Sequence, residues 1–161
     1  MYSIITLMAI AMLFPITAFA QAYVQTWDLV DSGKHLDYDG NSTYMSYINT
    51  GAATWNAYKS GVIRKDSAFV VEDVYVSDVN ASNGWAGMTY SSGKIELNTY
   101  YMSGYSNSKK QNVATHELGH ALGLDHSTST DVMDAAITGH TSTQALSQND
   151  KDSYDAAYNN Y

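Results

Sequence analysis

The sequence of 161 residues contains no cysteine and a single proline. Without cysteine, the chain can form no disulfide and offers a metal no thiolate ligand. A chain of this length can still bury a sizeable core, and its hydrophobic content of 45% and charged content of 15% indicate a globular protein rather than a disordered one. We therefore expect one domain that is held by its core.

Basic residues are also few. Eight lysines and arginines stand against sixteen aspartates and glutamates, which gives a formal net charge of -8. Because nucleic-acid-binding proteins favour basic patches, we expect no nucleic acid among the partners. The acidic balance agrees with cationic or neutral substrates, but negative charge that keeps a protein soluble is the simpler interpretation.

Residues 1–20 contain no charged side chain. Their apolar run begins at Ile4 and ends at Ala18 and Ala20, which have the A-x-A spacing of a signal-peptidase site. The pattern predicts a cleaved secretory signal and a mature domain of residues 21–161, secreted, extracellular and not stably associated with a membrane. The alternative is an uncleaved membrane anchor, but the run is at the short end for a bilayer span and contains Pro15.

Hydrophobic periodicity predicts strands early and helices late in the chain, which is an α+β order. Strands are predicted at 23–30, 69–79, 85–90 and 94–100, with a turn-rich connection at 35–42 and a loop over 124–146. Three helices are predicted: one capped by Ser42 or Thr43 that ends before Gly61, one capped by Asn107 or Ser108 that ends at Gly123, and one opened by a capping box at Ser147.

Three of the five histidines lie in the stretch VATHELGHALGLDHS, residues 113–127. Residues four apart share one face of a helix, so His116 and His120 point the same way. Two imidazoles at this spacing can bind one zinc ion. Glu117 lies beside them, offset by one residue, where it can reach a water on the metal without being a ligand itself.

A third protein ligand is needed if a fourth position on zinc is to stay open for water. Glu117 is the last glutamate of the chain, so no later glutamate can supply it. His126 can, but a helix continued to residue 126 would carry it roughly 15 Å along the axis from His116. Gly123 lacks a Cβ and accepts positive φ, so we predict that the chain turns back there and brings His126 to the site.

The spacing His116-Glu117-x-x-His120-x-x-Gly123-x-x-His126 resembles the extended zinc motif of metzincin metallopeptidases, H-E-x-x-H-x-x-G-x-x-H. The motif specifies five positions over eleven residues, so a chance match is improbable. Outside this motif, the order of the predicted helices and strands over most of residues 21–161 agrees with the family, although each such match is weak by itself.

A methionine in a tight turn after the third ligand is a further mark of this clan, and Met133 in STDVMD stands in that place. Astacin- and serralysin-like members have a tyrosine two residues later, where this sequence has Ala135, so the chain resembles small secreted bacterial matrixins. The resemblance implies an α+β fold with a twisted mixed β-sheet, an antiparallel edge strand, an early helix, a zinc-binding active-site helix and a C-terminal helix.

The resemblance also implies a function: a monomeric secreted zinc metalloendopeptidase that hydrolyses peptide bonds through a zinc-bound water, with Glu117 as general base. The edge strand would bind protein or peptide substrates, mainly through the backbone of Trp85, Ala86, Gly87 and Met88. Residues 134–140 would wall the pocket for the substrate side chain beyond the scissile bond. Two alternatives stay open, a non-catalytic zinc-dependent peptide-binding module on the same fold and a structural zinc domain.

Metal content differs from that of the matrix metalloproteinases. Those proteins hold a second, structural zinc through further histidines, whereas only His35 and His140 remain here, far apart in sequence, so we predict one zinc ion. Asp37, Asp39 and Asn41 could offer oxygens to calcium, but the same residue types suit a plain turn. Calcium has no other support in the sequence.

Overall fold

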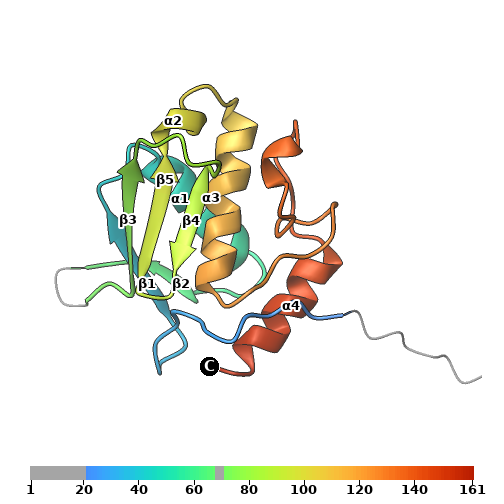
Figure 1. Ribbon diagram of the computed structural model, residues 1–161. Coiled ribbons are helices and arrows are strands. Elements are labelled where there is room, and N and C mark those ends of the chain that lie inside the picture. The colour runs from blue at the N-terminus through green and yellow to red at the C-terminus, as the bar shows by residue number, and fades with distance from the viewer. Residues whose placement is uncertain (1–20, 68–70) are drawn as a thin grey trace, which may run out of the picture.

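The computed structural model describes residues 21–67 and 71–161, and the predicted secretory signal lies outside them. Five strands form one sheet in the order β2-β1-β3-β5-β4 (Figure 1). The strands are β1 (Leu36–Gly40), β2 (Ile63–Lys65), β3 (Val74–Val79), β4 (Gly87–Tyr90) and β5 (Lys94–Asn98). The helices are α1 (Met45–Asn56), α2 (Thr99–Met102), α3 (Asn107–Ala121), the 3-10 helix η1 (Ile137–Gly139) and α4 (Gln148–Tyr158).

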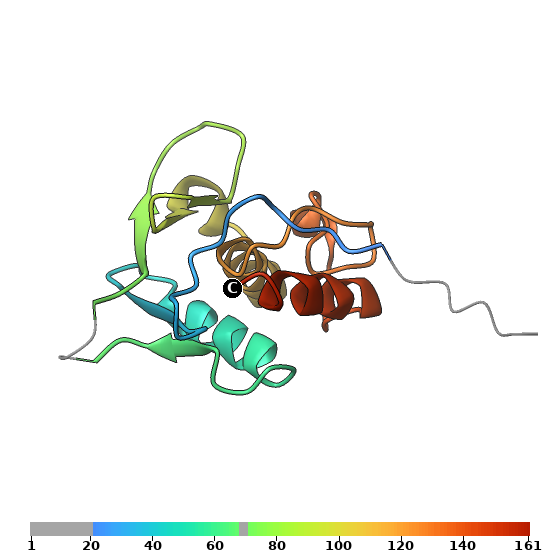
Figure 2. The same cartoon turned by 90° about the horizontal axis from the view of Figure 1, so that it is seen from below.

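Neighbouring strands of the sheet run parallel except at one edge. There β4 pairs antiparallel with β5, and Met88 lies opposite Glu96. Figure 2 shows α1 and α3 on the same side of the twisted sheet, with α4 beyond α3. This arrangement confirms the predicted mixed sheet with an antiparallel edge strand. Because β4 is an edge strand, the peptide groups on its outer side are free to pair with another chain.

Trp55 joins three helices in the core. Its side chain is fully buried, its indole N–H donates a hydrogen bond of 2.9 Å to the carbonyl of Thr115, and its ring lies edge-on against Tyr154 of α4. Gly51 brings α1 close to α3, since a Cβ at residue 51 would lie 3.1 Å from Cα of Thr115. Packed in this way, α3 has every residue from 111 to 121 buried.

The prediction of a first strand at residues 23–30 is wrong. Residues 23–30 form no strand of the sheet, only an isolated bridge between Val24 and Leu124, and the first strand is β1, inside the predicted turn-rich connection. Leu36 and Tyr38 are buried at alternate positions, as in a strand. The sequence did not predict this strand because aspartates lie between and after these two residues. The carboxylate of Asp37 is buried because it accepts two hydrogen bonds from Arg64 of β2, a partner 27 residues away.

The other predicted elements are present with shifted ends. Residues 74–79 of the predicted strand 69–79 form β3, while residues 69 and 70 lie outside the described residues. The predicted strands at 85–90 and 94–100 shorten to β4 and β5, and residues 99–102 form α2. No helix among the described residues has the length and apolar character needed to cross a membrane.

Helix caps decide the ends of the remaining elements. The N-cap of α1 is Tyr44 rather than Ser42 or Thr43, and the N-cap of α3 is Ser106, whose hydroxyl accepts from the N–H of Lys109. The capping box of α4 is confirmed, with Ser147 and Asp150 bonded to each other's backbone. The loop over 124–146 holds one short helix, η1, which the sequence did not predict.

Candidate metal centre

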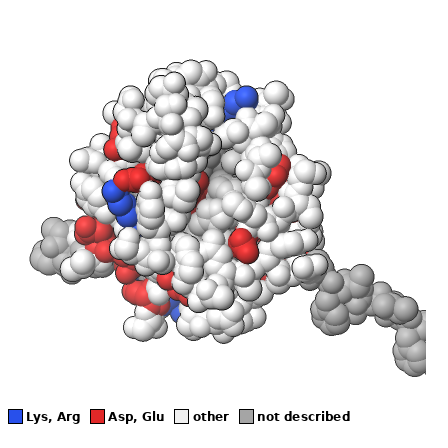
Figure 3. All heavy atoms as spheres, viewed as in Figure 1, with Lys and Arg blue, Asp and Glu red and all other residues white. Residues whose placement is uncertain are grey.

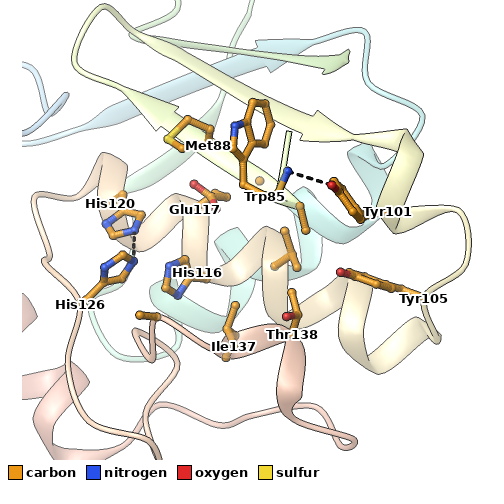
Figure 4. Close-up of a pocket in the computed structure, with 15 residues that line it drawn as sticks. Trp85, Met88, Tyr101, Tyr105, His116, Glu117, His120, His126, Ile137 and Thr138 are labelled. Carbon is orange, nitrogen blue, oxygen red and sulfur yellow. Dashed lines mark hydrogen bonds between the residues drawn. The ribbon is translucent and has the colours of Figure 1, made fainter. Parts of the chain in front are cut away.

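Three imidazoles converge at the end of α3. His116 and His120 lie on one face of the helix, and His126 returns from the turn beyond it, so that one ring nitrogen of each lies within 4.8 Å of the others (Figure 4). The Nε2 atoms of His120 and His126 are 3.2 Å apart. The structure therefore brings together the three histidines that the motif singles out, while His126 alone among them is exposed.

Gly123 makes this return possible for two reasons. Its φ of +83° is in the left-handed region, which only glycine enters without strain. In addition, a Cβ at residue 123 would lie 3.0 Å from Cβ of Asp28 and 3.3 Å from the carbonyl oxygen of Trp27. The turn predicted at this glycine is confirmed, and the N-terminal segment packs closely against it.

Hydrogen bonds fix which nitrogen of each helical histidine carries its proton. Nδ1 of His116 lies 2.8 Å from the carbonyl oxygen of Val132, and Nδ1 of His120 lies 2.8 Å from that of Leu124. A carbonyl oxygen can only accept, so each Nδ1 must donate. Each Nε2 then keeps its lone pair and faces the centre of the cluster, which is the form that binds a metal.

Burial keeps these imidazoles neutral. It lowers the pKa of His116 to about 3, with a further lowering from His120 that outweighs the opposing hydrogen bond to Val132. Burial also lowers the pKa of His120. Neutral imidazole is the ligand form, so folding has prepared the two histidines for a metal at neutral pH.

Glu117 lies beside the cluster and is buried, with 5% of its surface exposed. Burial raises the pKa of its carboxyl group to about 7. The hydroxyl of Thr89 donates a hydrogen bond of 2.7 Å to Oε2, which acts against this rise. The opposite oxygen, Oε1, faces Gly87 of β4, where a Cβ would come within 2.6 Å of it. No local pattern in the sequence indicates Thr89 or this role of Gly87, since both depend on how β4 lies against α3.

Met133 packs against α3 at Gly119, with 1% of its surface exposed. Its sulfur would be 2.3 Å from a Cβ at residue 119, so only Gly119 fits above it. The carboxylate of Asp150 accepts hydrogen bonds from the N–H groups of Val132 at 2.9 Å and Met133 at 3.1 Å. Because Val132 in turn holds His116, α4 is linked to the cluster through this turn. The sequence indicated Asp150 only as part of a helix cap.

A cleft of about 320 Å³ runs between β4 and η1 past the histidines. Figure 3 shows the face as mostly uncharged, and the charged residues on it are mainly acidic. All four residues predicted to bind substrate line this cleft, namely Trp85, Ala86, Gly87 and Met88. Its other wall includes Ala135, Ile137 and Thr138, within the predicted wall segment, and its far end adds Tyr101, Tyr105 and Val113, which the sequence did not indicate.

The donor set fits zinc. Imidazole is a preferred zinc ligand, and three protein ligands leave a position for water, as in catalytic rather than structural sites. Within residues 21–67 and 71–161, the other group of three acidic or histidine side chains is Asp31, Asp37 and Asp73. Arg64 already compensates the charge of Asp37, at 2.5 Å. Asp39, one of the residues that could offer an oxygen to calcium, lies in a strand rather than a turn. Calcium binding stays untested, and the sequence does not support it.

Comparison with known proteins places this arrangement in a family. A model of the matrixin family matches residues 17–159. The chain is similar in fold to the crystal structure of archaemetzincin from Methanopyrus kandleri, with a TM-score of 0.56 and 12% identity over 81% of this chain and 99% of that one. A search of curated protein sequences finds no match. Since the family match extends over nearly the whole described domain, the chain belongs to the matrixins and is a zinc metallopeptidase.

Proposed function

We propose that the protein is a secreted endopeptidase whose zinc ion is held by His116, His120 and His126, with Glu117 as general base. The observation that carries this proposal is the buried carboxylate of Glu117, which lies beside the three imidazoles rather than among them. A binding module has no use for such a group, because a buried carboxylate costs stability and contributes nothing to holding a peptide.

The chain's own residues supply proton transfer and positioning. When bound, zinc supplies Lewis acidity, which acidifies water and polarises a carbonyl group. Glu117 accepts the proton of the attacking water and later gives it to the leaving amine. Burial raises the pKa of this carboxyl group, so its carboxylate is a stronger base than an exposed one. Thr89 lies against Oε2, which leaves Oε1 as the oxygen that takes the proton.

Substrate binding follows from the free edge of the sheet. An extended peptide can add to β4 as a further antiparallel or parallel strand, so that its backbone is held by the strand and its side chains alternate toward and away from the cleft. The wall at Ala135, Ile137 and Thr138 then faces one substrate side chain. Strand pairing of this kind selects unfolded segments and loops rather than folded elements, as an endopeptidase requires.

Replacement of Glu117 by glutamine tests the assignment. The variant should bind zinc as the wild-type protein does but lose nearly all peptide hydrolysis, because the amide cannot accept the proton. Casein hydrolysis and zinc content are measured on residues 21–161, with a chelator-treated wild-type sample as the control. Wild-type turnover by Glu117→Gln would contradict the general-base role, and zinc-loaded wild-type protein that binds peptides without cleaving them would favour the binding module instead.

Secretion has its own test. Export followed by cleavage after Ala20 should give a protein that begins at Gln21. N-terminal sequencing of the protein recovered from the culture medium measures this directly. Recovery of the full chain from the membrane fraction would support the uncleaved anchor.

A further inference from the structure

Residues 23–29, here called the N-terminal strap, run beside the turn that carries the chain from α3 to His126. The backbone N–H of Gln25 donates to the carbonyl of Gly123 at 2.8 Å, and that of Asp125 donates to the carbonyl of Tyr23 at 2.9 Å. At the other end of the strap, the N–H of Leu29 donates to the carbonyl of Ala121. The strap thus pairs with residues 121–125, the segment that sets where His126 points.

One side chain of the strap reaches the metal centre itself. Nε2 of Gln25 lies 2.9 Å from Nδ1 of His120, across 95 positions of sequence. The same Nδ1 lies 2.8 Å from the carbonyl oxygen of Leu124, so it must carry its hydrogen. Two donors therefore face each other, while Oε1 of Gln25 is buried without a hydrogen-bond partner among the described residues.

A half-turn of the terminal amide resolves the conflict between the two donors. It exchanges Oε1 and Nε2 of Gln25 and sets an acceptor opposite the Nδ1–H of His120. The other solution would move the proton of His120 to Nε2, but this would set the Nδ1 lone pair against the carbonyl oxygen of Leu124. It would also remove the lone pair that a metal needs at Nε2.

We propose that Gln25 is a positioning residue for the metal centre: its amide oxygen, together with the carbonyl of Leu124, holds the Nδ1–H of His120 and so aims Nε2 at zinc. The inference rests on the zinc site of the proposed function and adds a residue outside the zinc motif to it. Outer hydrogen bonds of this kind fix the tautomer and orientation of a ligand histidine, and their loss weakens metal binding by about 10- to 100-fold.

Substitutions of Gln25 separate this role from general packing. Gln25→Leu keeps a similar volume but removes the acceptor, whereas Gln25→Glu keeps an oxygen at the same reach. Thr26→Ala is the matched control, since Thr26 is the exposed neighbour on the same strap. Zinc affinity is measured by competition with a chromophoric chelator, together with thermal unfolding of the zinc-free proteins and the ring nitrogen signals of His120 by NMR.

Gln25→Leu should bind zinc about tenfold more weakly or worse, Gln25→Glu at least as tightly as the wild type, and Thr26→Ala unchanged. Equal zinc affinity in Gln25→Leu and the wild type would overturn the inference. A zinc affinity of Gln25→Glu as low as that of Gln25→Leu would overturn it as well. If Gln25→Leu does not fold, Gln25→Asn, which is too short to reach His120, replaces it in the same comparison. A wild-type protein that binds no zinc would overturn the proposed function as well.

Discussion

The carboxylate of Glu117 fits against β4 because residue 87 is a glycine and has no side chain. Gly87 lies in β4, the strand proposed to hold substrate, and brings that strand to within contact of the proposed general base. Thr89, two residues on and on the same face of the strand, holds the other oxygen of the carboxylate. In the proposed function, a single edge strand therefore positions both the substrate backbone and the base.

A methyl group at residue 87 should therefore damage catalysis. In Gly87→Ala the new Cβ would meet Oε1 of Glu117 at 2.6 Å and push the carboxylate aside. A displacement of this size lowers kcat by roughly 100-fold, while zinc binding is unaffected. Gly104→Ala is the control, since a Cβ at residue 104 would meet only the carbonyl oxygen of Tyr101 among the described atoms, at an ordinary contact distance of 3.8 Å. Unchanged kcat in Gly87→Ala would show that Glu117 can act from another position.

The hydroxyl of Thr89 should affect catalysis only through its hydrogen bonds to Glu117. It lies 2.7 Å from Oε2 and 2.9 Å from the main-chain oxygen of the same residue. Thr89→Val keeps the shape and removes the hydrogen bond, which should lower kcat about tenfold or more with KM little changed. Thr89→Ser should restore most of the rate. Steady-state kinetics measure both variants, and a serine variant as slow as the valine variant would refute the hydrogen-bond role.

At the scale of elements, α4 supports the metal centre through the turn at Val132 and Met133. Asp150 serves two purposes with one carboxylate: it closes the capping box of α4 and accepts from the N–H groups of Val132 and Met133. The turn so held supplies the carbonyl that orients His116. A change in α4 should therefore reach the metal centre through backbone contacts.

Asp150→Ala should lower both stability and zinc affinity. It leaves the N–H groups of Val132, Met133 and Ser147 without their acceptor in a buried region, which costs about 3 kcal/mol of the free energy of unfolding. Chemical denaturation and chelator competition measure the two effects. Asp152→Ala, on the same helix, should stay within about 0.5 kcal/mol of the wild type. A zinc affinity unaffected by Asp150→Ala would disprove the link from α4 to the metal centre.

Local patterns predicted the elements whose signals are local. The periodicity of α3, the positive φ of Gly123 and the capping box at Ser147 are each set within a few residues, and all three are present. Strand β1 was not predicted because Asp37 is buried against Arg64. These two residues are too far apart in the sequence for a local pattern to reveal the pair. The apolar segment 23–30 misled for the opposite reason, since it pairs with a turn rather than with the sheet.

The same division holds within the candidate site. The three histidines and Glu117 lie within eleven residues, so a sequence motif reveals them. The turn at Gly123 explains why the three imidazoles converge. Apart from the carbonyl of Leu124, the groups that orient them come from β4, the N-terminal strap and the turn at Val132, between 16 and 95 positions away in sequence. Their side chains are common types at ordinary spacings, so only the folded arrangement distinguishes them.

At the scale of the whole molecule, the metal centre buries ionisable groups in a domain that has no disulfide. Folding buries His116 and Glu117 together, which disfavours the charged form of both groups. Each effect makes the stability of the zinc-free protein depend on pH. The two dependences have opposite signs, so they can be separated.

Glu117 should make the zinc-free protein less stable as pH rises. Its pKa is raised from 4.5 to about 7 on folding, so below pH 4.5 both states are protonated, and between these values only the unfolded state ionises. Stability is thus fully present at low pH and is lost up to about pH 7, by at most about 3 kcal/mol. His116 acts oppositely, since its pKa is lowered to about 3 and stability falls as pH falls below 6.5.

Glu117→Gln isolates the carboxylate, because the histidine contribution is common to both proteins and cancels in their difference. In chelator-treated samples, the melting temperature of Glu117→Gln minus that of the wild type should grow between pH 4.5 and 7.5 and then level off. Thermal denaturation followed by circular dichroism at four or five pH values gives this curve. A flat difference would mean that Glu117 is hydrated in the folded zinc-free protein, so that burial does not raise the pKa of its carboxyl group.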